Sequence, residues 1–458
     1  MPTLQCVVLL ALAGCVGNAA MEPTPGTRDV PAAVRLEQDI AAVANQRRQG
    51  SPLWPQFDPM SVPLAVHDGE RTWFFRHPSP PDGSARLPAP LQAVSTFPGR
   101  HPAVTANSTA EIGGVLTATV IIDTTAQGTS PGRAALAVHE AFHGFQRLRH
   151  PSWSANEADL FLYPTSDASA LALRRIESSA LRAAVGATGA QSACWARAAL
   201  DARSRRYALL DSASIAYERG TELNEGLASY VERKVRDDDA EIIPPDEYGI
   251  ADVRVRAYAS GLAFAVLLDR HGPGWAESLE SHDAQFLDAL LTTALGPRPA
   301  CAFPRAFVDA ATGRAVADIA RLAASRAAQL ATFHARNGWR VIIESPNSPL
   351  WPQGFDPINV ERLTAGDVLH SRFLRLGNDA GAITMLDEAG ADLDALTSAH
   401  GAHPLFNGID RVEVAGLADP RVEVVGDTLR VKVVGLSAEF LGATVSRSEK
   451  TVVVRIGR

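Results

Sequence analysis

The chain has few cysteines, no excess of basic residues and no long uncharged hydrophobic run in its body. Its 458 residues include 4 Cys, 43 Lys or Arg and 51 Asp or Glu, which gives a formal net charge of −8. An acidic balance without a basic patch argues against nucleic acid as a partner. The lack of an 18-residue apolar stretch excludes a transmembrane helix from the body of the chain. The length leaves room for two or three domains.

The first residues have the features of a targeting segment. A short apolar stretch over residues 7–13 leads into Leu12-Ala13-Gly14-Cys15. This string resembles the lipobox of bacterial lipoproteins, although residues 1–5 contain no Lys or Arg. The resemblance implies a signal peptide over 1–14, lipidation of Cys15 and a tether over 15–35. The protein is then expected in the bacterial cell envelope, lipid-anchored in the outer membrane and facing the periplasm. The alternative is a secreted or soluble periplasmic protein cut near Ala19-Ala20.

Cys194 and Cys301 are the cysteines left beyond that segment, and their separation is unlike that of metal ligands. In an oxidising compartment they could form a disulfide. They could equally be two buried thiols, and both alternatives stay open.

The string His139-Glu140-Ala141-Phe142-His143 has the HExxH form of a zinc hydrolase helix. On a helix, residues four apart share a face, so His139 and His143 can bind one ion together. Glu140 can reach a water beside the metal without being a ligand, which is the position of a general base. Zinc with three protein ligands keeps a fourth position open and lowers the pKa of a bound water to about 7.

The surrounding residues predict a helix. Ser130-Pro131 is a typical helix start, and His150-Pro151 a typical end. An apolar stripe with helical spacing, formed by Val138, Phe142 and Phe145, lies beside the two histidines. One side of this helix is therefore expected to pack in the core while the other lines a cleft. The alternative is an amphipathic helix with two surface histidines.

A carboxylate for the third ligand stands 82 residues after His143, in Asn224-Glu225-Gly226. Three further carboxylates compete for the role: Glu222 is a candidate to orient a ligand imidazole, and two are expected on a solvated face, namely Glu218 and Glu232. Glu225 is favoured because Gly220 and Gly226 flank it. Glycine costs about 1 kcal/mol relative to alanine in a helix, which the close approach of another helix or of a ligand would explain.

HExxH followed by a helix with N-E-G resembles the gluzincin metallopeptidases, the thermolysin and aminopeptidase type. The resemblance implies one Zn²⁺ per chain, held by His139, His143 and Glu225, and a peptide or protein as substrate. It covers only these two helices and the Tyr258 string. An Asp four residues after the ligand Glu orients the first His in thermolysin-like enzymes, but Ser229 stands there. The exopeptidase motif G-x-M-E-N is absent.

Two further elements fit this interpretation. Tyr258, in the string Tyr258-Ala259-Ser260-Gly261, is a candidate to stabilise the oxyanion of the transition state, with Tyr230 and Tyr248 as rivals. Alternatively, each tyrosine is a packed core residue. The β-branched stretch 113–123 predicts a strand, which either binds substrate by strand addition or lies in the interior of a sheet.

Periodicity along the chain predicts an α+β fold. A zincin-like metallopeptidase domain is expected over 36–337, with a β-rich part over 51–125 and a mainly helical part over 131–335. An all-β, sandwich-like domain is expected over 338–458, where β-branched strings alternate with turns. The string Ser51-Pro52-Leu53-Trp54-Pro55 recurs as Ser348-Pro349-Leu350-Trp351-Pro352. It predicts either Trp-anchored turns or a duplicated pair of exposed tryptophans on the substrate side.

The chain is therefore predicted to be a zinc metallopeptidase, with Glu140 as general base and Tyr258 as oxyanion donor. The alternative is a non-catalytic surface-binding or scaffold lipoprotein with a vestigial or structural metal site. A hydrolase acting on another carbonyl substrate is a third possibility.

Overall fold

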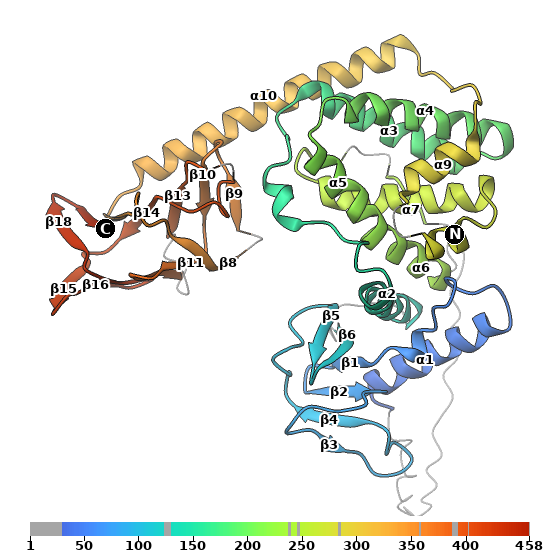
Figure 1. The fold of residues 1–458 in the computed structure, drawn as a ribbon, viewed down its shortest axis with the longest axis horizontal. Coiled ribbons are helices and arrows are strands. Elements are labelled where there is room, and N and C mark those ends of the chain that lie inside the picture. Colours follow the sequence, from blue (N-terminus) through green and yellow to red (C-terminus); the bar gives the residue numbers. More distant parts are fainter. Residues whose placement is uncertain are drawn as a thin grey trace, which may run out of the picture.

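The computed structural model describes residues 30–122, 130–236, 240–244, 248–282, 285–356, 359–386, 393–401 and 403–457. The fold is α+β, with strands at the start, helices in the middle and strands at the end (Figure 1). The predicted signal peptide and Cys15 lie outside the described residues. No helix in the described part is both long enough and apolar enough to cross a membrane.

A six-stranded mixed sheet forms the N-terminal part, in the order β3-β4-β2-β1-β6-β5. Its parallel pair is β1–β6, and β5 runs antiparallel at the outer edge next to β6. The strand expected over 113–123 is thus an interior strand, β6, and the edge beside it belongs to β5. The strands are β1 (Leu64–His67), β2 (Arg71–Phe75), β3 (Ala85–Arg86), β4 (Ser95–Pro98), β5 (Ser108–Ile112) and β6 (Val115–Ile121).

Helix α1 (Ala32–Arg48) precedes this sheet and packs through Leu36, Ile40 and Ala44. It begins before the predicted residue 36, so the tether expected over 15–35 ends in a helix. A 3-10 turn, η1 (Pro59–Ser61), leads into β1. Helix α2 (Ser130–Arg149) lies between the sheet and the remaining helices (Figure 1). Sheet and helices share one hydrophobic core, so they form one structural unit.

The helical part follows α2. A new helix, α5, begins soon after α4 ends, because Asp211 accepts a hydrogen bond from the backbone of Ser214 and caps it. The elements are η2 (Glu157–Phe161), α3 (Ala168–Gly186), α4 (Gly189–Tyr207), α5 (Ser212–Thr221), η3 (Glu222–Gly226), α6 (Leu227–Arg236), α7 (Val253–His271), α8 (Trp275–Ser281), α9 (Leu287–Leu295) and α10 (Arg305–Ala335).

A disulfide joins Cys194 in α4 to Cys301, which lies between α9 and α10. The backbone N–H of Cys301 also donates to the carbonyl oxygen of Cys194 at 3.1 Å. Of the two alternatives for this pair, the structure therefore shows the disulfide.

The C-terminal strands form two sheets that share a core, as in a β-sandwich. Their orders are β18-β19-β7-β14-β13-β10-β9 and β15-β16-β17-β12-β11-β8. The strands are β7 (Trp339–Glu344), β8 (Trp351–Phe355), β9 (Val360–Arg362), β10 (Asp367–His370), β11 (Phe373–Asn378), β12 (Gly381–Leu386), β13 (Asp394–Ser398), β14 (Arg411–Leu417), β15 (Arg421–Val425), β16 (Thr428–Val433), β17 (Leu436–Leu441), β18 (Thr444–Ser448) and β19 (Thr451–Arg455).

The two copies of the Ser-Pro-Leu-Trp-Pro string have different environments. Trp54 is buried and donates from Nε1 to Glu280 at 2.8 Å, so the first copy is a Trp-anchored turn. Trp351 is 48% exposed at the start of β8. The expectation of a Trp-anchored turn therefore holds for the first copy and is wrong for the second.

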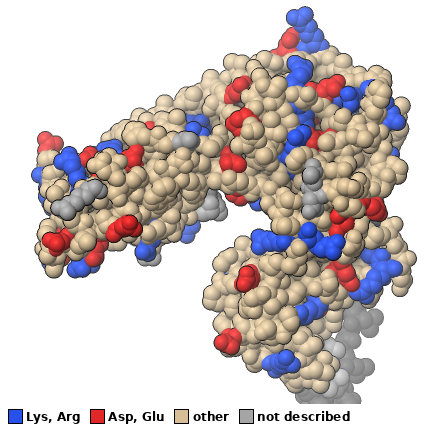
Figure 2. Space-filling model, in the orientation of Figure 1, with Lys and Arg blue, Asp and Glu red and all other residues tan. Residues whose placement is uncertain are grey.

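Figure 2 shows acidic and basic side chains interspersed over the visible face. The same face is hollowed between the C-terminal strands and the N-terminal sheet, beneath the helical part (Figures 1 and 2). Helix α10 spans from the helical part to the C-terminal strands (Figure 1).

Candidate metal centre

Helix α2 carries both histidines and packs through the predicted stripe. Val138, Phe142 and Phe145 are all buried. The ring of Phe142 meets Trp54 and Phe57 with centroid distances of 5.7 and 5.1 Å. The helix ends at Arg149, just before His150-Pro151, as predicted. This packing fixes the rotation of α2 about its axis and so directs the histidine face toward α6 and η3.

Glu225 lies in a π-helical turn, η3, between α5 and α6. Such turns occur mostly as single-turn bulges, often at functional sites. A Cβ on Gly226 would stand 2.6 Å from Cα of Gly261, and a Cβ on Gly220 would stand 2.4 Å from the carbonyl oxygen of Ser154. The predicted close approach of another helix is thus confirmed at Gly226, whereas the neighbour of Gly220 is the loop at Ser154. At Gly226 the neighbour is helix α7, which places residues of α7 beside Glu225.

Three potential ligand atoms meet between α2 and η3. The Nε2 atoms of His139 and His143 are 3.1 Å apart, and Oε2 of Glu225 lies 3.6 Å from the first and 3.1 Å from the second. A tetrahedral zinc with ligand distances of about 2.0–2.1 Å separates neighbouring ligand atoms by about 3.3–3.4 Å. The observed triangle, with sides of 3.1, 3.1 and 3.6 Å, is therefore close in size to that of three ligands around one metal ion. In the described part of the chain, these three residues are the group that could hold a metal.

The other nitrogen of each imidazole is fixed by a partner. Nδ1 of His139 lies 2.9 Å from Oε2 of Glu232, and Nδ1 of His143 lies 2.8 Å from Oε1 of Gln146. The amide of Gln146 in turn donates to the carbonyl oxygens of Leu223 and Asn224, both at 2.9 Å. With Nδ1 as the donor on each ring, Nε2 is left as the lone-pair atom that faces the centre. Sequence reasoning missed both of these orienting residues.

The two oxygens of Glu225 have different neighbours. Oε2 faces the histidines, whereas Oε1 accepts a hydrogen bond from Arg254 at 2.9 Å. Arg254 also pairs with Glu157 and donates to the hydroxyl of Tyr258 at 3.2 Å. Burial would raise the pKa of Glu225, but hydrogen bonds from His139 and His143 hold this pKa far below its usual range. Glu225 is therefore a carboxylate with one oxygen directed at the centre.

The imidazole of His139 is strongly affected by the carboxylates around it. Burial opposes its charged form, but Glu225 and Glu232 raise its pKa to about 9. Without a cation, the centre therefore retains a proton on His139 at neutral pH. A metal ion would take the place of this positive charge and release the proton.

Glu140 follows His139 in α2 and is buried, with 6% of its surface exposed. Burial raises the pKa of its carboxyl above the ordinary value, although His139 and His143 oppose that rise. Thr109 in β5 donates to the carbonyl oxygen of Glu140 at 2.9 Å, which holds this turn of α2 against the edge strand. A carboxyl with a raised pKa is a suitable group to accept and return a proton.

Tyr258 lies close to the centre, while the rival tyrosine Tyr230 does not face it. The hydroxyl of Tyr258 accepts a hydrogen bond from Arg254 at 3.2 Å, and its pKa is raised first by burial and then by the negative charge of Glu225. Its hydroxyl therefore stays protonated and able to donate. The hydroxyl of Tyr230 donates to Asp269 at 2.9 and 3.0 Å, in a packed cluster with Trp54 and Trp275. Tyr248 packs against the hydrophobic core.

The competing carboxylates have other roles than expected. Glu218 is buried and pairs with Arg206, so the expectation of a solvated face is wrong for it. Glu222 is also buried, contacts Arg203 and Ser260, and orients no imidazole. That role belongs to Glu232, which was expected on a solvated face.

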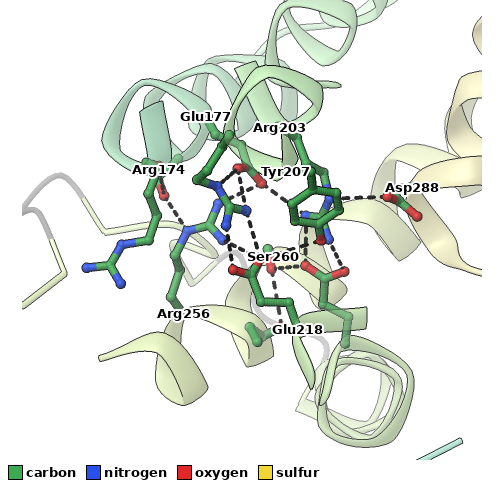
Figure 3. A network of polar contacts seen from close by, with 12 residues as sticks. Arg174, Glu177, Arg203, Tyr207, Glu218, Arg256, Ser260 and Asp288 are labelled. Atoms are coloured by element: carbon green, nitrogen blue, oxygen red, sulfur yellow. Dashed lines mark hydrogen bonds and ion pairs between the residues drawn. The ribbon is translucent and has the colours of Figure 1, made fainter. Parts of the chain in front are cut away.

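A buried network of ion pairs joins α5 and η3 to the helices around them (Figure 3). Arg203 donates to Glu177 at 3.0 Å and to Glu222 at 2.9 Å, and it lies 3.3 Å from Asp288. Three guanidinium groups thus face four carboxylates in the protein interior: Arg203, Arg206 and Arg256 against Glu177, Glu218, Glu222 and Asp288. Glu222 is one turn from Glu225, so the network fixes the backbone that presents this candidate ligand.

No family model, no curated protein and no solved structure matches this chain. Its function is therefore inferred from the geometry of its own residues.

Proposed function

We propose that this protein is a zinc-dependent hydrolase that cleaves peptide bonds, with a gluzincin-type site on a zincin-like domain. The observation that carries the proposal is the triangle of His139, His143 and Glu225, with a buried Glu140 beside it. A purely structural metal site has no need of a carboxylate in that position. Zinc held by the three residues would supply Lewis acidity, lowering the pKa of water and polarising a carbonyl group.

The chain's own residues have distinct tasks in this proposal. Glu140 accepts a proton from the attacking water on its carboxylate and passes it to the leaving amine. Tyr258 donates from its protonated hydroxyl to the developing oxyanion. Arg254 holds Oε1 of Glu225 and the Tyr258 hydroxyl, so it positions both of these groups. Glu232 and Gln146 keep the two imidazoles in the required tautomer.

The edge strand β5 supports a peptide as the substrate. It is the outermost strand of its sheet, next to α2, and it runs antiparallel to its neighbour β6. Two hydrogen bonds join Thr109 of this strand to α2. Its hydroxyl donates to the carbonyl oxygen of Glu140, and its carbonyl oxygen accepts from Arg147. An extended peptide can add to an exposed sheet edge through main-chain hydrogen bonds. We propose that β5, rather than β6, has this role.

Incubation of the full-length, zinc-loaded protein with a mixed peptide library tests the function. Wild type is expected to cleave peptides. Glu140→Gln is expected to keep its zinc and to cleave at least about 100-fold more slowly than wild type. Glu70→Gln changes an exposed carboxylate on the N-terminal sheet and should behave like wild type. Absence of cleavage by the zinc-loaded wild type would contradict the proposal and favour the scaffold alternative, as would equal cleavage by Glu140→Gln.

We also propose that the chain is a lipoprotein anchored through Cys15. The support is the lipobox-like string Leu12-Ala13-Gly14-Cys15. Mass spectrometry of the protein from a bacterial membrane fraction should show an acylated N-terminal Cys15. Release of an unmodified protein cut near Ala19-Ala20 would contradict this.

A further inference from the structure

A pocket of about 830 Å³ lies between the helical part and the C-terminal sandwich, away from the candidate metal centre. Its walls come from four segments of the chain: the stretch 160–166, residues 250–251, helix α10 and the stretch 360–365. Ligand pockets typically measure about 300–1,000 Å³ and often lie between domains. The pocket therefore has the size and the location of a small-molecule site.

Most of the wall is apolar, and its apolar residues include Leu160, Phe161, Leu322, Val360 and Leu363. A second hollow of about 330 Å³ continues along α10 and shares part of this wall. Its lining includes Ile319, Ala327 and Leu330 on the helix. The two hollows together form an elongated apolar space.

Two arginines line this space: Arg326 where the two hollows meet, and Arg362 in the wall of the larger one. Arg326 lines both hollows, and its Nε is buried with no hydrogen-bond partner among the residues that the structure describes. Arg362 donates to backbone carbonyl oxygens only: that of Phe161 at 2.7 Å, that of Thr364 at 3.1 Å and that of Ala365 at 3.2 Å. Burial lowers the pKa of Arg362, and the charge of Arg326 lowers it further. The positive charges of Arg326 and Arg362 thus repel each other at this pocket.

One carboxylate faces the same pocket, and it does not neutralise both charges. Glu361 accepts from the side-chain amide of Gln329 at 2.8 Å. Tyr163 also lines the pocket, with its hydroxyl directed to Glu218. The titratable groups of the pocket therefore leave an excess of one positive charge. A singly charged anion would balance it, and a guanidinium binds a carboxylate with strong charge-assisted hydrogen bonds.

We propose that this pocket binds an amphipathic carboxylate, that is, a small monoanion with an elongated apolar tail. Its carboxylate meets Arg326 and Arg362, and its tail lies along Leu322 and Leu363. Two sources carry this chemistry: a fatty acid, or a short peptide that ends in an apolar residue with a free carboxyl group.

Isothermal titration of the full-length protein with octanoate, and separately with a short acetylated peptide ending in leucine, tests the proposal. At least one of these probes should bind one per chain. Octanol and the amidated peptide have the same tails without the charge. Both should bind at least about ten-fold more weakly than the charged probes. Acetate, which has the charge without the tail, should show no saturable binding. Octanoate binding alone identifies the fatty-acid source, and peptide binding alone identifies the peptide source.

Arg326→Gln should weaken the bound probe about ten-fold or more, because it removes a charge-assisted hydrogen bond. Arg321→Gln is the matched control on the same helix, since its side chain is 75% exposed and does not line the pocket. Equal melting temperatures of the two variants would show that both remain folded. The proposal is overturned if neither probe binds, if the neutral analogues bind as tightly as the charged ones, or if Arg326→Gln binds like wild type.

Discussion

Nδ1 of His139 lies 2.9 Å from Oε2 of Glu232, seven residues after the candidate ligand Glu225. Burial would raise the pKa of Glu232, but the hydrogen bond from His139 lowers it, so the carboxylate is charged at neutral pH. Glu232 is therefore placed to orient His139, as an Asp four residues after the ligand Glu does in thermolysin-like enzymes. Ser229 occupies that position, and the carboxylate that contacts the imidazole of His139 instead lies almost one helical turn further along α6.

Glu232→Gln is predicted to weaken zinc binding about 10- to 100-fold, because a neutral amide oxygen is a weaker acceptor than a carboxylate for Nδ1–H of His139 and fixes its tautomer less firmly. Ser229→Ala is the control, since it removes the side chain at the position used by thermolysin-like enzymes. It should leave the affinity unchanged. Competition with a chromogenic chelator measures both variants. Loss of affinity in Ser229→Ala, with Glu232→Gln unaffected, would reverse the assignment.

Sequence patterns predicted the parts of the site that depend on local structure. The ends of α2 follow from Ser130-Pro131 and His150-Pro151, and the stripe of Val138, Phe142 and Phe145 determines which side is buried. The glycine at position 226 correctly indicated a close helix contact at Glu225, although the partner helix could not be named.

Long-range contacts account for what the sequence did not show. Arg254 reaches Glu225 because α7 crosses η3 at Gly261, a contact between segments distant in the chain. The π-helical turn that contains Glu225 departs from regular helical periodicity, and this obscured the relation between Glu225 and Glu232. A run of acidic residues usually marks a solvated face, but buried arginines neutralise Glu218 and Glu222.

Gly226→Ala is predicted to destabilise the protein by about 1–3 kcal/mol and to lower its zinc affinity, because the new Cβ would collide with the backbone at Gly261. Gly313→Ala is a matched control in α10, where a Cβ meets no atom within 4 Å. It should raise stability by about 0.5–1 kcal/mol through its higher helix propensity. Thermal unfolding with parallel zinc titration distinguishes the two. A tolerated Gly226→Ala would show that the helices are further apart than described.

Arg203→Met is predicted to cost about 3–5 kcal/mol, because it leaves Glu177 and Glu222 charged and buried without their shared partner. Arg321→Met changes an arginine of α10 whose side chain is 75% exposed, and it should shift stability by about 0.5 kcal/mol or less. Denaturant unfolding of both variants checks this. Similar small effects in both would mean that the buried network does not hold η3 in place.

His370 provides a pH test of the C-terminal sandwich. Burial lowers the pKa of its imidazole to about 4, below the ordinary 6.5. The folded state favours the neutral imidazole. The contribution of His370 to the free energy of unfolding is therefore fully present above pH 6.5 and is lost as the pH falls toward 4. Over that window the loss is on the order of 3 kcal/mol. His370→Gln should therefore lose less stability on acidification than wild type, as measured by melting at pH 7, 5.5 and 4.5. Parallel curves for the two proteins would contradict the burial of a neutral imidazole.

Calorimetric titration of the chelator-treated, full-length protein with zinc tests the central claim most directly. Wild type should bind one zinc per chain, and Glu225→Ala should bind it at least about 100-fold more weakly, because a ligand atom is lost. Glu157→Ala removes a nearby carboxylate that pairs with Arg254 rather than with the imidazoles, and it should keep the stoichiometry of one. A wild-type protein that binds no zinc, or a Glu225→Ala variant that binds it like wild type, would contradict the assignment of His139, His143 and Glu225 as the metal centre.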